Sequence, residues 1–133
     1  MQFGPHVVPL NNVIYQTKYT YVFSNLRPLC EGHILVTPIR CVPFLHDLTH
    51  EEMIDFTKVC QFAGQTMKKH LHTQRLNLTI QDGVEAGQTV PHVHCHVVPM
   101  NESTEFIRQY PDDQTRIEST NLFKSYFQFE LNK

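Results

Sequence analysis

The chain lacks the features that mark several classes of protein. Its net charge is only −2, and its basic residues occur singly apart from Lys68 and Lys69, so the sequence indicates no basic surface for a nucleic-acid backbone. No apolar run reaches the length of a membrane span, and the first ten residues, MQFGPHVVPL, lack the basic and apolar segments of a secretory signal. We therefore expect a soluble cytoplasmic protein, with the nucleus as a second candidate compartment and with neither nucleic acid nor a membrane as its partner.

Paired cysteines are also missing. The four cysteines lie far apart and form no CxxC motif, so neither a disulfide framework nor a zinc knuckle is indicated. The 133 residues, 41% hydrophobic and 18% charged, fit one domain over 1–133 with a single core. We expect free, buried or half-buried thiols at Cys30, Cys41, Cys60 and Cys95.

Two kinds of periodicity predict the secondary structure. Apolar and polar residues alternate in KYTYVFSNL and again in HILVTP, which predicts an antiparallel strand pair within 19–37. Thr49 and Glu52 then form a capping box, and apolar residues recur at spacings of three and four, which predicts an amphipathic helix over 50–71. We expect His70 and His72, near its end, to be solvated.

Two further strands follow the helix. The stretch RLNLTIQDG alternates again, and the run HVHCHVVP at 92–99 makes the last strand. The order strand, strand, helix, strand, strand predicts the α+β class, with a long helix on one face of an antiparallel sheet. The tail over 101–133 is polar, with an amphipathic ending, NLFKSYFQFEL.

The histidine run places His92, His94 and His96 on one face of a strand, because residues two apart point the same way. Packing, metal binding and nucleophilic catalysis are the candidate roles. Three imidazoles spread along a strand converge poorly on one ion, so we expect no metal held by the protein. A neutral imidazole can attack phosphorus when its other nitrogen carries the proton, and a hydrogen bond to a carbonyl would fix that tautomer. His94 has an imidazole on either side and is the candidate nucleophile.

The loop EAGQT, just before this strand, suits a phosphate. Gly87 has no side chain to block the approach of an anion to backbone N–H groups, and Gln88 and Thr89 add neutral donors. Gln81, at the polar end of its strand, would point toward the same mouth.

The motif HVHCHVV resembles that of the histidine triad family, and QDGVEAGQTVPHVHCHVVP is similar to its dinucleotide-hydrolase branch. The segments FGPH, VFSNLRPLCEGHILVTPIR and FLHDLTHEE extend this resemblance over 3–100. The sequence departs from the branch at Val84, where proline is usual, at Cys95, where valine is usual, and at Met100, where a basic residue is common. The tail does not match.

The resemblance implies a HIT-like fold in which two chains join their sheets as a homodimer. It implies hydrolysis of diadenosine polyphosphates, above all the triphosphate, to AMP and ADP through a nucleotidyl-histidine intermediate. Mg²⁺ or Mn²⁺ would accompany the substrate, with no cofactor bound to the protein. A purine nucleoside phosphoramidase and a dinucleotide-binding signalling module with little turnover are the alternatives.

The resemblance also implies roles for particular residues. His94 would be the nucleophile, His96 would contact the scissile oxygen and assist the departure of ADP, and His92 would orient the other two. His33 would be a buried support of the triad. Substrate-binding residues would be His6, Asn25, Gln81, Gly87, Gln88, Thr89 and Val90. Phe3, Phe23 and Leu35 would line an adenine cleft or simply fill the core.

Overall fold

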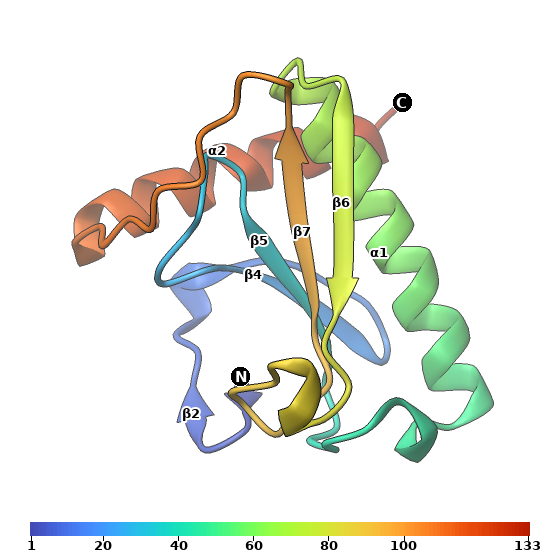
Figure 1. Ribbon diagram of the computed structural model, residues 1–133. Helices are drawn as coiled ribbons and strands as arrows, with labels where there is room; N and C mark the ends of the chain where they lie inside the picture. Colours follow the sequence, from blue (N-terminus) through green and yellow to red (C-terminus); the bar gives the residue numbers. More distant parts are fainter.

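A computed structural model describes residues 1–133 as a five-stranded antiparallel sheet with two long helices (Figure 1). The sheet order is β3-β4-β5-β7-β6, and β1 and β2 form a separate hairpin. The α+β class and the long helix on one face of an antiparallel sheet are confirmed. The elements are β1 (Gln2–Phe3), β2 (His6–Val7), β3 (Val13–Gln16), β4 (Thr20–Ser24), β5 (Ile34–Pro38), α1 (His50–His70), β6 (Arg75–Ile80), β7 (Cys95–Met100) and α2 (Asp113–Leu131).

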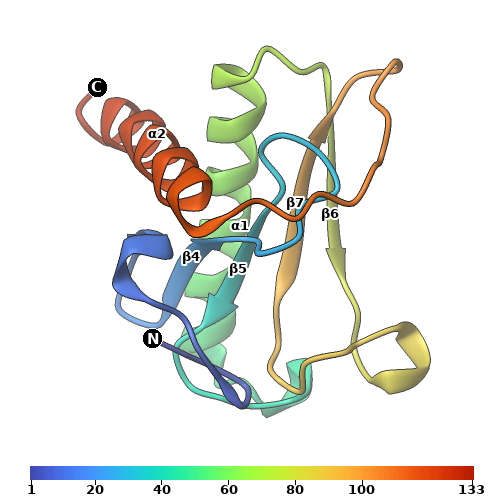
Figure 2. The same ribbon diagram turned by 90° about the vertical axis from the view of Figure 1, so that its left-hand side faces the viewer.

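The helix side of the sheet holds the larger core. Apolar residues of α1, among them Phe56, Ala63 and Met67, pack on inward residues of β4, β5 and β7. Phe123 and Phe127 of α2 complete this cluster, because α2 crosses the β3–β4 end of the sheet and contacts α1 (Figure 2). Neither helix contains an apolar stretch long enough to cross a membrane.

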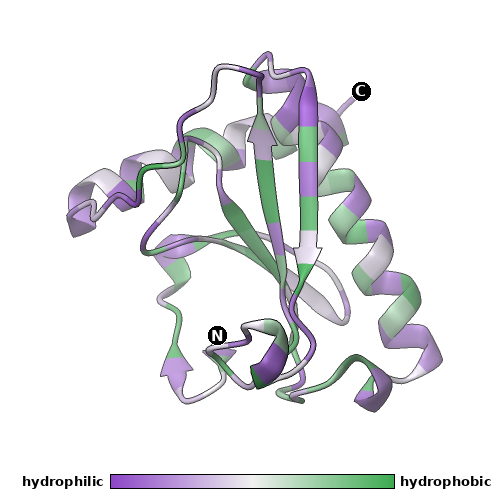
Figure 3. Ribbon diagram, viewed as in Figure 1, coloured by the Kyte–Doolittle hydropathy of each residue, from purple (hydrophilic) through white to green (hydrophobic).

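The opposite face is only partly covered. The N-terminal segment packs Phe3 and Val8 on Tyr21, Phe23 and Leu35, which form a second, smaller cluster. At the far side of the sheet, β6 is an outer strand whose hydrophobic and hydrophilic positions alternate (Figure 3). The N-terminal hairpin therefore covers one end of this second face of the sheet.

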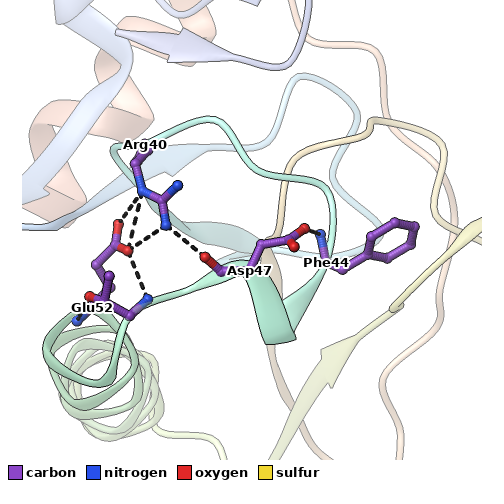
Figure 4. A network of polar contacts seen from close by, with 5 residues as sticks. Arg40, Phe44, Asp47 and Glu52 are labelled. Carbon is purple, nitrogen blue, oxygen red and sulfur yellow. Dashed lines mark hydrogen bonds and ion pairs between the residues drawn. The ribbon is translucent and has the colours of Figure 1, made fainter.

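The start of α1 is tied to the chain that precedes it (Figure 4). Thr49 and Glu52 form the expected capping box, in which each side chain accepts a hydrogen bond from the backbone N–H of the other residue. Arg40 donates to both carboxylate oxygens of Glu52, at 2.8 and 3.1 Å, and to the carbonyl of Asp47 at 2.7 Å. The bonds from Arg40 lower the pKa of Glu52, so this buried carboxylate stays charged.

One expected boundary is wrong, and the tail helix is longer than the amphipathic ending that the sequence indicates. Ladder pairing in the histidine strand begins at Cys95 rather than His92, because the preceding backbone bonds elsewhere: Val93 N–H donates to the carbonyl of Val42, 2.8 Å away. The tail helix begins at Asp113, well before the expected amphipathic ending. Its N-cap, Asp112, accepts from Thr115 N–H at 2.8 Å, and its polar first turns carry little apolar periodicity.

Two expectations about side chains also need correction. His70 is not solvated, because α2 folds back on the last turn of α1: its Nε2 lies 2.9 Å from a Glu130 oxygen and its ring stacks on Tyr126. His72 is exposed, as expected. All four cysteines are free, but Cys41 is exposed, whereas Cys30, Cys60 and Cys95 are buried.

Candidate active site

The three motif histidines lie on the sheet face opposite the long helix. Val93, Cys95 and Val97, which alternate with them, belong to the core under that helix. The rings of His94 and His96 are 5.0 Å apart between centroids, and the Phe3 ring stands edge-on to His94 at the same distance. The period-two prediction that all three imidazoles share one face is confirmed.

His92 is anchored at both ring nitrogens. Its Nδ1 accepts a hydrogen bond from Gly4 N–H at 2.9 Å, and its Nε2–H donates to the carbonyl of Pro38 at 2.7 Å. The side chain is completely buried, and burial lowers its pKa, which favours the neutral ring. With no free nitrogen and no exposure, His92 can hold its neighbours in place but cannot touch a substrate.

His94 has one nitrogen engaged and one free. Its Nδ1 lies 2.7 Å from the carbonyl oxygen of His92, so Nδ1 carries the proton and Nε2 keeps its lone pair. Burial lowers the pKa of the ring, so His94 is neutral at pH 7. An unprotonated Nε2 held in one tautomer is the form that a nucleophile requires.

His33 determines which ring nitrogen of His96 carries the proton. Leu29 N–H donates to His33 Nδ1 at 3.0 Å, so His33 carries its proton on Nε2, which lies 3.0 Å from His96 Nδ1. His96 is therefore protonated at Nε2, on the side away from His33. Burial lowers the pKa of both rings to about 4. The pair presents a neutral N–H donor beside the free nitrogen of His94.

Contacts with other groups of the chain fix the shape of the loop before the triad. Gly87 adopts a φ of +96°, a conformation that favours glycine, and the Gln81 amide nitrogen lies only 2.6 Å from the place where a Cβ would stand. The Gln88 amide, expected to face substrate, instead accepts from Gly83 N–H and donates to the Pro43 carbonyl. The backbone N–H groups of Gly87 and Gln88 also bond inside the loop.

Thr89 and Val90 provide the donors that remain free. Neither their backbone N–H groups nor the Thr89 hydroxyl makes a hydrogen bond within the chain. Thr89 is exposed and Val90 is half-buried beside the N-terminal hairpin, where Val90 would contact any side chain added at Gly4. An anion in front of the triad would therefore meet these groups rather than the Gln88 side chain.

The remaining predicted residues lie at the two ends of the triad. At one end, His6 pairs with Phe3 across the hairpin and is exposed. At the other end, the Asn25 amide nitrogen lies 3.2 Å from His33 Nε2. Phe23 and Leu35 pack with Phe3 in the smaller cluster. No group of three or more His, Cys, Asp or Glu side chains is arranged to hold a metal ion.

Comparison with known proteins identifies the family. The HIT domain matches residues 8–103, which is most of the chain. The chain belongs to the HIT domain family. It is 44% identical over 97 residues to the Arabidopsis thaliana protein named bifunctional bis(5'-adenosyl)-triphosphatase/adenylylsulfatase FHIT, a match that covers 73% of this chain and 54% of that protein.

Solved structures share this fold. A Plasmodium falciparum diadenosine triphosphate hydrolase in complex with cyclomarin A is 37% identical, with a TM-score of 0.88 over 96% of this chain and 83% of that one. The Caenorhabditis elegans NitFhit protein is 32% identical, also with a TM-score of 0.88, over 95% of this chain and 30% of its own. This HIT domain spans between 22% and 65% of the length of its curated relatives from C. elegans and Dictyostelium discoideum.

Sequence reasoning missed three groups of this HIT domain. Gly4 N–H and Leu29 N–H set the tautomers of His92 and His33, but backbone donors leave no signal in a sequence. Arg108, which lies beyond the residues that the HIT domain matches, has a positive charge that lowers the pKa of both His33 and His96. In the sequence, Arg108 stands out only as the one lysine or arginine between Arg75 and Arg116.

Proposed function

We propose that this HIT domain hydrolyses diadenosine polyphosphates, above all diadenosine triphosphate, to AMP and ADP through a nucleotidyl-histidine intermediate. The hydrogen bond from His94 Nδ1–H to the His92 carbonyl carries the proposal, because it leaves Nε2 unprotonated at neutral pH. The names of the Arabidopsis and Plasmodium relatives support the choice of substrate.

The reaction proceeds in two displacements. In the first, His94 Nε2 bonds to the α-phosphorus as the bridging P–O bond breaks, and the electron pair of that bond stays on the departing ADP oxygen. The Nε2–H of His96 donates a hydrogen bond to that oxygen. In the second, water attacks the phosphorus and gives up one proton to the solvent, the N–P electron pair returns to His94, and AMP leaves with the oxygen from water.

The loop binds the reacting phosphate in this proposal. The free N–H groups of Thr89 and Val90 and the Thr89 hydroxyl meet the non-bridging oxygens, and Gly87 leaves space for the Gln81 amide beside them. Gln88 acts by shaping the loop, since its amide bonds to backbone on both sides. His6, Asn25 and Gln81 contact the nucleoside parts. Mg²⁺ or Mn²⁺ arrives bound to the polyphosphate oxygens of the substrate, because oxygen ligands suit these ions better than imidazole does.

The test is turnover of diadenosine triphosphate, followed by chromatography of AMP and ADP. His94→Asn removes the nucleophilic nitrogen, and we expect it to lose at least a thousandfold in kcat while still binding nucleotide. His72→Asn is the matched control, because His72 is exposed with a left-handed φ of 55°, which asparagine tolerates. Retained turnover by the His94→Asn protein would rule out the covalent mechanism.

Two further assays distinguish the proposed hydrolase from the two alternative functions. A purine nucleoside phosphoramidase would cleave adenosine phosphoramidate faster than diadenosine triphosphate. A signalling module would release the intact dinucleotide faster than it cleaves it, which single-turnover kinetics would reveal.

We also propose that the chain acts as a homodimer whose two sheets join. The outer strand β6 has an unpaired edge, and its Leu78 and Ile80 side chains are 45% and 37% exposed. Sedimentation of the wild type should give the mass of two chains, and Leu78→Lys should weaken the association. We assign the cytoplasm as its compartment, in keeping with four free thiols; localisation of a tagged protein tests this.

A further inference from the structure

The tail after β7 returns to the site as an ordered segment. Gln109 N–H donates to the carbonyl of Pro28 at 2.9 Å, and Arg108 Nη1 donates to the carbonyl of Arg27 at 2.8 Å. The Arg27 guanidinium lies over the Tyr110 ring, 5.6 Å from its centroid. Three consecutive tail residues are thus held against the loop that joins β4 and β5.

This loop connects Arg108 to the triad by direct contacts. Arg27 N–H donates to the Asn25 side-chain oxygen at 2.9 Å, and the Asn25 amide lies beside His33. His33 in turn bonds to His96. Arg108 therefore sits at the His33–His96 end of the site, opposite the N-terminal hairpin that anchors His92.

The charge of Arg108 is available at this end of the site. Arg40, Arg75 and Arg116 each pair with a carboxylate, whereas Arg108 has no acidic partner. Apart from the neighbouring histidines, Arg108 is the one side chain whose charge lowers the pKa of a site histidine, and the two affected are His33 and His96. Its positive charge therefore acts on the side of the site where His96 faces the departing group.

We propose that Arg108 binds the phosphates of the leaving nucleotide and so makes the enzyme selective for substrates that release an anion over those that release a neutral amine. The inference rests on the hydrolysis proposed above and identifies the residue that selects the leaving group. When the P–O bond of a dinucleoside polyphosphate breaks, negative charge grows on the leaving oxygen, and a nearby guanidinium stabilises it. A phosphoramidate releases its amine after proton transfer to nitrogen, so no such charge develops.

The test compares two substrates in three variants. Arg108→Gln removes the charge, and we expect kcat/KM for diadenosine triphosphate to fall roughly 10- to 100-fold, while kcat/KM for adenosine phosphoramidate changes less than about threefold. Arg108→Lys keeps the charge and should recover part of the loss. Arg27→Gln is the control, because it removes the contact with Tyr110 but leaves Arg108 in place; both substrates should change less than about threefold. An equal loss on both substrates in Arg108→Gln, or no loss on either, would refute the assignment.

Binding separates this inference from the hydrolysis on which it rests. In the His94→Asn background, calorimetry measures the affinity for diadenosine triphosphate and for AMP without turnover. Adding Arg108→Gln should weaken binding of the dinucleotide about tenfold and that of AMP less than about twofold. If the wild type cleaves neither substrate, the proposed hydrolysis is refuted. The loss of affinity for the dinucleotide relative to that for AMP then decides the role of Arg108 alone. Equal weakening of both ligands, or of neither, would overturn that role.

Discussion

His92→Phe tests whether the first motif histidine acts only by holding the site together. Phenylalanine keeps the ring but leaves the Gly4 N–H and the Pro38 carbonyl without partners. Gly4 is half-buried and can recruit water, so its loss costs about 1 kcal/mol; Pro38 is buried, so its unpaired carbonyl costs about 2–3 kcal/mol. We expect the free energy of unfolding to fall by about 3–4 kcal/mol, a large effect for one residue.

Urea unfolding followed by circular dichroism at 222 nm measures this loss. His94→Asn provides the comparison, because His94 makes one internal hydrogen bond, worth about 1 kcal/mol. The two variants should therefore separate: His92→Phe loses mainly stability, with turnover falling because the His92 carbonyl shifts, whereas His94→Asn loses turnover with little change in stability. A His92→Phe protein as stable as wild type to within about 0.5 kcal/mol would refute the reasoning.

Three further predictions concern charge. The pKa of both His33 and His96 is lowered to about 4, whereas in the unfolded chain a histidine has its ordinary pKa near 6.5, so below pH 6.5 the unfolded chain binds more protons than the folded one. The free energy of unfolding is therefore full above pH 6.5 and should fall by about 3 kcal/mol or more by pH 4.5. In His96→Asn the fall should be about 2 kcal/mol smaller, and urea titration at each pH measures both. Arg108→Gln should raise the pKa of His96, which NMR titration of its ring protons measures; an unchanged value would place Arg108 away from the site. Asp55→Ala should cost about 2–4 kcal/mol in thermal or urea unfolding and Asp55→Asn less, because one Asp55 oxygen accepts three hydrogen bonds that link α1 to the β3–β4 turn; equal losses in the two variants would contradict this account.

The elements that the sequence predicted are those whose pattern is local. Alternation of side chains depends only on an extended backbone, so His92, His94 and His96 share a face even though ladder pairing starts at Cys95. The helix start was predictable from Thr49 and Glu52, because a capping box lies within four residues. The need for a carbonyl at His94 Nδ1 was also predictable, although not that His92 itself supplies it.

The groups that the sequence did not reveal depend on contacts between distant segments. The hairpin strands β1 and β2 have two residues each, too few for a period, yet Gly4 bonds to His92 across 88 positions. Arg108 reaches the Arg27 carbonyl across 81 positions. Gln88 illustrates the opposite error: a polar residue in a loop suggests a ligand donor, but folding buries it between backbone groups. Composition cannot distinguish a donor that faces solvent from one that faces the chain.

The single exposed thiol makes this chain convenient to label. A maleimide dye would react at Cys41, while Cys95, between two motif histidines, stays shielded. Cys41 precedes Val42, whose carbonyl accepts from Val93 N–H, so the dye would report on the backbone that carries the triad. Fluorescence of the labelled wild-type sequence would then follow nucleotide binding without any engineered cysteine.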